Sequence, residues 1–229
     1  MTTPSGYPRT ETLRRGVLLR AILNAVMVAK EPDLARFLSW DGKNYALNNA
    51  DGTYGALTFE ADDVVGVFFD SQSSRNPYIS DGSYDVDAYF RGMPSRLRVI
   101  AESQTLRYNR QVYRGQTVSL ITAAFWSAGE YLTAAFPWSD VFRNGAHIVR
   151  VELLPDSAAW KEWQDSYQAS PEELDFARSL FDRRMSDPAR PVVLKESEVD
   201  GIRKRARDPQ AFADCLKALK PLGILPPRK

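Results

Sequence analysis

TVSLITAAFWSAGEYLTAAFPWSDVFRNGAHIVRVELL, residues Thr117–Leu154, is the stretch that decides the fold we expect for this chain. It is the longest region with so few charged side chains, and it holds two of the five tryptophans and the only histidine. Runs of β-branched and aromatic residues favour buried strands, and we predict them at 118–126 and 147–154. Pro137 begins and Asn144-Gly145 ends a predicted short helix between them.

Neighbouring residues on a strand point to opposite faces of the sheet, and this rule applies to Phe125 and Trp126. We expect their burial to differ, with one ring in the core and the other under a helix or at a cleft. Residues 130–136, which follow this strand, fit either a strand or a helix.

The residues before this stretch predict an antiparallel meander. Strand patterns cover Tyr45–Asn48, 54–60 and 64–70, and Asp51-Gly52 is a hairpin turn signal. The segment 64–70, VVGVFFD, is apolar on both faces, so we expect it at the centre of the sheet. Gly66 inside this segment indicates a close approach of another part of the chain.

Helical patterns account for much of the remaining chain. Apolar residues three and four positions apart predict helices over 17–29 and 84–107, the second broken near Gly92-Met93-Pro94. Ser170-Pro171-Glu172-Glu173 is a capping box with proline at the first helical position. It opens a helix that we expect to end near Met185.

The fold class that these patterns predict is α+β, with a mostly antiparallel sheet flanked by helices and a helical C-terminal third. The sheet is expected from residues 44–70, 117–127 and 147–154. We expect a single domain, 1–229, with a mixed α/β core over 10–155 and a helical part over 156–229. Residues 1–10 contain two prolines and a glycine and are expected to form a loose arm.

Charge and hydropathy restrict the class of partner. The 229 residues include 30 Lys and Arg against 29 Asp and Glu, so the net charge is only +1. Nucleic-acid binding usually requires a basic excess, and we expect no nucleic-acid partner. The apolar run 17–29 is interrupted by Arg20 and Asn24 and is too short to span a bilayer, so we expect no membrane partner.

Few residues are available for metal or cofactor chemistry. Cys215 is the only cysteine, which fits a reducing cytoplasm, and it lies on the predicted buried side of a helix. One cysteine and one histidine, His147, do not make a zinc site, and 81–89 lacks the glycine and final glutamate of an EF-hand loop. Nucleophile-elbow, dinucleotide and Walker motifs do not occur. We expect no catalytic residue, no cofactor and no metal.

One enzymatic alternative depends on four side chains. The tripeptide YRG with Arg114, then Ser119 and Thr122, then VELLP with Glu152 resemble the Arg, Ser/Thr and Glu elements of ADP-ribosyltransferases. The resemblance implies that Arg114 grips dinucleotide phosphates and that Glu152 polarises the ribose. Three departures are the short span between Arg114 and Glu152, a Ser/Thr strand motif that is not intact, and Arg150, which stands where that family has the usual upstream partner of the glutamate.

The strings VVGVFFDSQSSRNPY and ITAAFWSAGEYLTAAFPWSDVFRNGAH resemble an uncharacterised bacterial protein family, over residues 10–185. That resemblance implies no residue roles. Without a catalytic set, we expect a non-enzymatic protein that binds another protein. The specific form that we expect is a bacterial immunity-type protein that neutralises a toxin by direct binding.

Two segments are candidates for the binding surface. The loop 71–83 is long and polar, and 136–145 places aromatic and charged residues around a short helix. Aromatic anchors beside charged groups are typical of interface centres. The candidate residues are Arg75, Tyr78, Phe136, Trp138, Asp140 and Arg143. The alternative is that Trp138 closes the end of the core and that the loop is a solvated connection.

Overall fold

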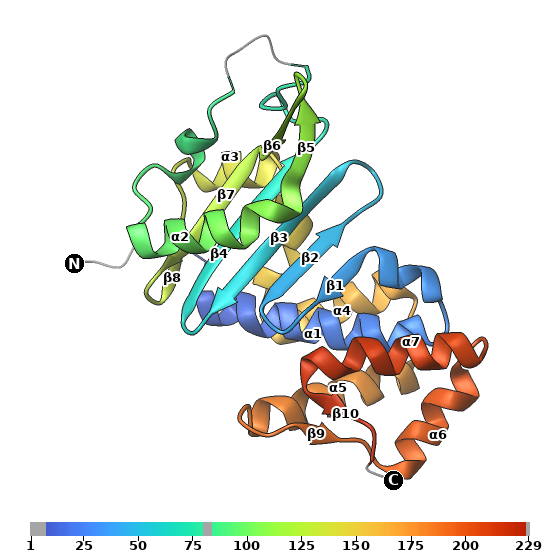
Figure 1. The fold of residues 1–229 in the computed structure, drawn as a ribbon. Coiled ribbons are helices and arrows are strands. Elements are labelled where there is room, and N and C mark those ends of the chain that lie inside the picture. The colour runs from blue at the N-terminus through green and yellow to red at the C-terminus, as the bar shows by residue number, and fades with distance from the viewer. Residues whose placement is uncertain (1–7, 80–83, 228–229) are drawn as a thin grey trace. The chain divides into compact units, whose positions relative to one another are not determined.

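The computed structural model describes residues 8–79 and 84–227 (Figure 1). Most of the expected arm and the end of the loop 71–83 therefore lie outside the described residues. The chain divides into two compact units. The first contains residues 8–13 and Lys43–Leu153, and the second contains Arg14–Gly42 and the chain from Leu154 onward. The α+β class is confirmed, and the change to helical structure near residue 155 coincides with a boundary between the units.

The first unit is built on an antiparallel sheet with the strand order β2-β3-β4-β7-β8. Its strands are β2 (Asn44–Asn48), β3 (Thr53–Glu60), β4 (Asp63–Asp70), β7 (Ala123–Ala128) and β8 (Tyr131–Thr133). β4 lies between β3 and β7, which confirms the prediction of a central strand. Gly52, with φ of +91°, lies in the predicted turn between β2 and β3.

Gly66 is a point of close packing in the sheet. It pairs with Leu57 on β3 and with Phe125 on β7. A Cβ atom at Gly66 would lie 2.7 Å from Leu57 Cδ2 and 3.0 Å from the ring of Phe125. The glycine therefore leaves the space that the leucine and the phenylalanine fill, as its place in the sequence predicts.

Phe125 and Trp126 point to opposite faces, but the prediction that their burial differs is wrong. Their exposed fractions are 0% and 2%. The ring of Phe125 contacts Phe68 and Trp138, with centroids 5.3 and 5.6 Å away. Trp126 belongs to a core cluster with Leu97 of α2 (Ser95–Ser103). Both faces of the sheet are covered, so neither ring reaches solvent (Figure 1).

The expected strand over 147–154 is also wrong. This segment forms the 3₁₀ helices η4 (Ala146–Val149) and η5 (Val151–Leu153). The buried side chains are Val149 and Glu152, three positions apart, which fits three residues per turn rather than alternation. Glu152 is buried because its carboxylate accepts a hydrogen bond from the Tyr45 hydroxyl at 3.0 Å.

A separate hairpin occupies the start of the stretch that was expected to be one buried strand. β5 (Arg110–Tyr113) pairs with β6 (Gln116–Ser119), and the strand β7 begins only at Ala123. Arg114 and Gly115 form the turn with φ of +50° and +78°. Two positive φ values match the twist of a two-residue hairpin.

Short helices complete the first unit. They are η2 (Val86–Phe90), α2, η3 (Thr105–Asn109) and α3 (Trp138–Arg143). The predicted helix at 138–143 is confirmed, with Pro137 as the residue before it and Asn144 as the residue after it. The predicted helical region 84–107 is confirmed with its break at residues 92–94.

The second unit is mainly helical. Its elements are α1 (Thr10–Val28), whose first turn belongs to the first unit, η1 (Pro32–Arg36), β1 (Leu38–Trp40), α4 (Asp156–Tyr167), α5 (Pro171–Ser186), β9 (Val192–Val193), α6 (Glu196–Arg205), α7 (Pro209–Leu219), η6 (Lys220–Leu222) and β10 (Ile224–Leu225). The capping box at Ser170 is present, and β9 pairs with β10 in parallel. Among residues 8–79 and 84–227, no helix has the length and apolarity that a membrane crossing requires.

Replacing Phe125 with alanine should lower the free energy of unfolding by about 3–5 kcal/mol, because the cavity lies between Gly66 and Trp138 in a fully buried site. Val112→Ala is the control, because Val112 is exposed and should change the stability by no more than about 0.5 kcal/mol. Urea denaturation measures both. A loss below about 1 kcal/mol for Phe125→Ala would contradict the core assignment.

Candidate functional site

The two segments singled out in the sequence follow strands that run in the same direction. β4 and β8 are each joined to β7 in antiparallel fashion, β4 directly on one side and β8 on the other. β4 and β8 therefore run in the same direction. The loop begins after Asp70, whereas the segment after Thr133 leaves the sheet beside Val65, because Thr133 pairs with Trp126 and Trp126 pairs with Val65. Both continue in the same direction, and contacts of Arg75 with the segment 136–145 show that they meet.

Arg75 joins the two segments. Its guanidinium Nη2 lies 3.3 Å from Asp140 Oδ2, and its Cζ lies 4.1 Å from the centroid of the Phe136 ring. The side chain of Arg75 is 21% exposed, so the charge is held between a carboxylate and an aromatic face. Arg143, which is exposed, also approaches Asp140, at 3.9 Å. Four of the six candidate residues thus contact one another or share a partner with Arg75.

Hydrogen bonds fix the backbone around this cluster. Ser73 Oγ donates to Asn144 Oδ1 at 2.6 Å, and Asn144 Nδ2 donates to the Asp140 carbonyl at 2.7 Å. Thr122 Oγ1 donates to the Asn144 carbonyl and accepts from the Asp70 amide. The loop after β4 and the end of α3 are therefore held in one arrangement without any bound partner.

Trp138 packs inward. Its ring lies between Phe125 and Phe142, with both centroid distances at 5.6 Å. Its indole Nε1 is buried and has no hydrogen-bond partner among the described residues. This placement agrees with the alternative in which Trp138 closes the end of the core.

Tyr78 lies apart from this cluster, against the hairpin. Its hydroxyl donates to the Val112 carbonyl at 2.7 Å, and its ring meets Tyr113 edge-on with centroids 5.4 Å apart. Tyr113 in turn donates its hydroxyl hydrogen to the Pro77 carbonyl at 3.2 Å. The loop and β5 are thus joined by two reciprocal tyrosine contacts.

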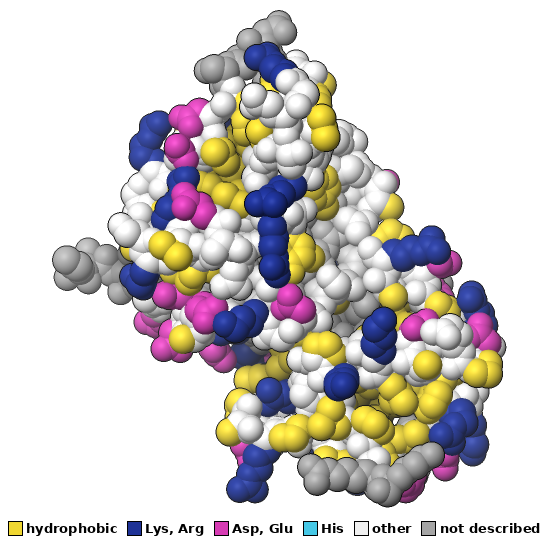
Figure 2. Space-filling model, in the orientation of Figure 1, with side chains coloured by type: hydrophobic (Ala, Val, Ile, Leu, Met, Phe, Trp, Pro, Cys, Tyr) yellow, Lys and Arg dark blue, Asp and Glu magenta, His cyan; other side chains and the backbone are white. Residues whose placement is uncertain are grey.

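Exposed hydrophobic side chains gather at this junction. Within the described part of the chain, five large hydrophobic residues are exposed, and three of them are Tyr78 at 50%, Ile79 at 64% and Val112 at 68%. Together with Arg110 and Arg114 of the hairpin, these residues are called the tip surface. Figure 2 shows hydrophobic and basic side chains side by side over the part of the first unit where β5 and β6 lie.

The charge of the tip surface has one sign. From Ser103 to Gly129 the sequence contains no Asp, Glu or Lys but has Arg107, Arg110 and Arg114, and all three arginines are exposed. In the described residues, no carboxylate pairs with Arg110 or Arg114. These two guanidinium groups are available to an acidic partner.

Two half-buried tyrosines lie near the tip surface, and one of them, Tyr84, is hydrogen-bonded to the chain at and after β6. The Tyr84 hydroxyl accepts a hydrogen bond from the Ile121 amide at 2.6 Å and donates to the Ser119 carbonyl at 3.1 Å. Burial raises the pKa of the Tyr84 phenol well above its ordinary value. Burial, with a smaller contribution from Tyr78, raises the pKa of Tyr54 to about 12. Both phenols therefore stay protonated at neutral pH.

Val112 was missed in the sequence because the hairpin was not recognised, and Ile79 was not singled out although it lies in the loop 71–83. Arg114-Gly115 is a weaker turn signal than Asn-Gly, although glycine in its second position accepts a positive φ. The alternation of Arg110, Val112 and Arg114 with the residues between them is the signal that could have located β5.

The carboxylate that the ADP-ribosyltransferase alternative requires, Glu152, is not accessible. Glu152 has no exposed surface and is hydrogen-bonded by Tyr45, whereas Arg114 is exposed in the hairpin turn. Ser119 Oγ donates to the Leu106 carbonyl at 3.0 Å. In this arrangement Glu152 cannot contact a ribose, so the geometry gives no support to this chemistry.

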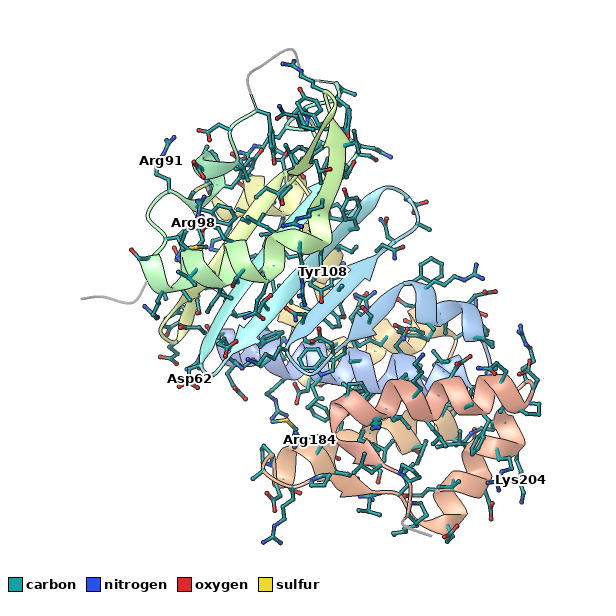
Figure 3. The ribbon with its side chains drawn as sticks, in the orientation of Figure 1. Asp62, Arg91, Arg98, Tyr108, Arg184 and Lys204 are labelled. Atoms are coloured by element: carbon teal, nitrogen blue, oxygen red, sulfur yellow. The ribbon has the colours of Figure 1, made fainter. Side chains whose placement is uncertain are left out.

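Other chemical groups are occupied or inaccessible. Arg98, labelled in Figure 3, lines a shallow hollow on α2, but its charge is already paired with Asp87 and Glu102 and its guanidinium stacks on Phe90. In the second unit, burial raises the pKa of the Cys215 thiol to about 12, which disfavours a reactive thiolate. Within the described ranges, no group of three or more His, Cys, Asp and Glu side chains could hold a metal ion.

No protein-family model matches the chain, and no curated protein or solved structure is significantly similar to it. The class of this protein must therefore come from its own surface and its own chemistry. The feature that stands out is the tip surface, where apolar and basic side chains are exposed on a hydrogen-bonded base.

Tyr84→Phe should lower the free energy of unfolding by about 1–3 kcal/mol, because the Ile121 amide and the Ser119 carbonyl lose their hydrogen-bond partner. Amide hydrogen exchange should also become faster in β5 and β6. Tyr131→Phe is the control, since the hydroxyl of Tyr131 makes no hydrogen bond within the described residues. Equal stability of the two variants would show that Tyr84 does not support the hairpin.

The raised pKa of Tyr54 predicts a loss of stability at high pH. The phenol holds its proton more tightly in the folded chain than in the unfolded chain, where the pKa is about 10. Its contribution is therefore present below pH 10 and is lost as the pH rises towards about 12. Urea denaturation at a series of pH values should show that the free energy of unfolding falls less between pH 10 and about 12 for Tyr54→Phe than for the unchanged chain. Parallel pH profiles of the two proteins would refute this assignment.

Proposed function

We propose that this chain is a non-enzymatic protein that binds another protein through the tip surface. The observation that carries the proposal is the grouping of Tyr78, Ile79 and Val112, which are each at least half exposed. Contiguous exposed apolar groups on a soluble chain are characteristic of interaction sites. Because hydrogen bonds already hold Tyr78 and the hairpin in place, little ordering would oppose binding.

The charge of the tip surface supports an acidic partner. Arg110 and Arg114 flank Val112 and have no carboxylate partner within the described residues. Guanidinium groups lose their hydration more easily than ammonium groups and bind carboxylates with two parallel hydrogen bonds. A partner with an apolar centre and an acidic rim would therefore match this surface in shape and in charge.

Within this class, our specific proposal is a bacterial immunity-type protein that acts in the cytoplasm and neutralises a toxin by direct binding. Such a protein requires a pre-formed, specific surface and no catalytic group of its own. A single buried cysteine is compatible with a reducing compartment. The arginines of the tip surface would speed the encounter with an acidic toxin surface.

The test compares two double variants as baits in lysate of the source organism. Ile79→Asp with Val112→Asp changes the tip surface, and Val99→Asp with Val193→Asp changes two other exposed valines. The unchanged chain and the control variant, Val99→Asp with Val193→Asp, should each capture one partner protein in stoichiometric amount. The tip variant should bind it at least about thirtyfold more weakly, because buried carboxylates replace the apolar anchors.

Circular dichroism and melting temperature must show that both double variants are folded. Equal capture by the tip variant and the control would refute the tip surface as the binding site. Co-expression of the captured partner tests the immunity proposal. The unchanged chain should restore growth that the partner inhibits, and the tip variant should not. A partner without any effect on growth would rule out toxin neutralisation while leaving protein binding intact.

A further inference from the structure

The second unit contains a cavity of about 420 Å³ that the tip surface does not share. Its walls come from α1, η1, β1, α7 and η6, and Figure 1 shows α7 alongside α1 with β1 next to them. Cavities that bind small molecules are typically about 300–1,000 Å³. The size therefore fits a small organic molecule.

Small side chains create this cavity. Ala21 and Ala25 are one helical turn apart on α1, and Ala218 of α7 also lines the space. Trp40 forms another part of the wall, where its indole Nε1 donates to the Pro221 carbonyl at 3.2 Å. The aromatic wall is thus held by a hydrogen bond rather than free to fill the space.

Asn24 supplies a buried polar group to the same wall. Its side chain is 3% exposed, and its Oδ1 accepts a hydrogen bond from the Tyr167 hydroxyl at 3.0 Å. Its Nδ2 has no hydrogen-bond partner among the described residues.

Asn24 Nδ2 is not sealed off from every contact, so a molecule in the cavity that it lines can accept its hydrogen bond. A water molecule could satisfy Asn24 Nδ2, but water would then also lie against the apolar walls made by the alanines and Trp40. A ligand with one polar atom and an apolar body satisfies both requirements. The charged groups that line the cavity, Asp214 and Lys217, lie on its more exposed side on α7.

We propose that this cavity is a binding site for a small, flat, largely apolar molecule with a single hydrogen-bond acceptor such as a carbonyl oxygen. Asn24 Nδ2 donates to that acceptor, and the aromatic face of Trp40 and the small side chains of α1 and α7 contact the apolar body. The site is independent of the tip surface, because the two lie in different units and share no residue.

The first experiment titrates the full chain with two probes of nearly equal shape, 2-acetylnaphthalene and 2-ethylnaphthalene. Binding is followed by calorimetry and by the NMR signal of the Trp40 indole N–H. We expect saturable binding of 2-acetylnaphthalene, at least about tenfold tighter than that of 2-ethylnaphthalene, because only the former accepts a hydrogen bond. Equal affinities, or no saturable shift with either probe, would overturn the proposal.

The second experiment blocks the cavity. Ala218→Phe fills it, and Ala213→Phe places the same side chain on the same helix at an exposed position outside the cavity. Ala218→Phe should weaken the binding of 2-acetylnaphthalene at least about tenfold. Ala213→Phe should leave this affinity unchanged. Asn24→Leu should reduce the preference for the acetyl probe to less than about twofold.

Each variant is first shown to be folded by circular dichroism. If Ala218→Phe does not fold, the proposal is tested by the ratio of the two probe affinities, measured on the unchanged chain and on Asn24→Leu. Equal effects of Ala218→Phe and Ala213→Phe would place the probe elsewhere and refute the site. None of these outcomes depends on the protein partner proposed for the tip surface.

Discussion

The contact of Phe125 with Gly66 is the constraint on which the first unit depends. The ring fills the space that the glycine leaves, so β4 and β7 can pair while Phe125 also reaches Trp138. The opposite faces of the same two strands carry Val65 and Trp126 into the cluster covered by α2. Because helices and loops cover both faces of the sheet, residues that bind a partner can lie only at its edges and in the loops that connect its strands.

The tip surface lies in the connections of the sheet, since both of its faces are covered. β4 and β8 run in the same direction, and the loop after β4 is held by contacts of Ser73 and Arg75 with the segment 136–144. The same loop continues to Tyr78, which the hairpin holds in an exposed position. The packed cluster around Arg75 therefore supports the tip surface rather than forming it. Its charge is already neutralised by Asp140, whereas Arg110 and Arg114 are available.

The second unit is less completely packed, because a cavity remains between its helices. Its helices bury Trp160, Trp163 and Phe181, but small residues on α1 and α7 line a space elsewhere in the unit that is not filled. A tightly packed interior has few such spaces, and an amide facing into one indicates a polar contact that the chain itself does not supply. The two candidate sites thus differ in kind, one a group of exposed side chains and the other a cavity that opens to solvent on one side.

Local patterns in the sequence were sufficient for the central strand, the turn at Gly52, the helix at 138–143 and the capping box at Ser170, because each depends on residues close in sequence. The 3₁₀ helices at 146–153 were mistaken for a strand, since apolar alternation does not reveal that Tyr45 would pair with a buried Glu152. The sequence also identified Arg75 and Tyr78, but only the tertiary structure placed the first in a packed cluster and the second beside Val112. Exposure and the neighbours of a side chain depend on contacts between segments far apart in the chain, which no local pattern contains.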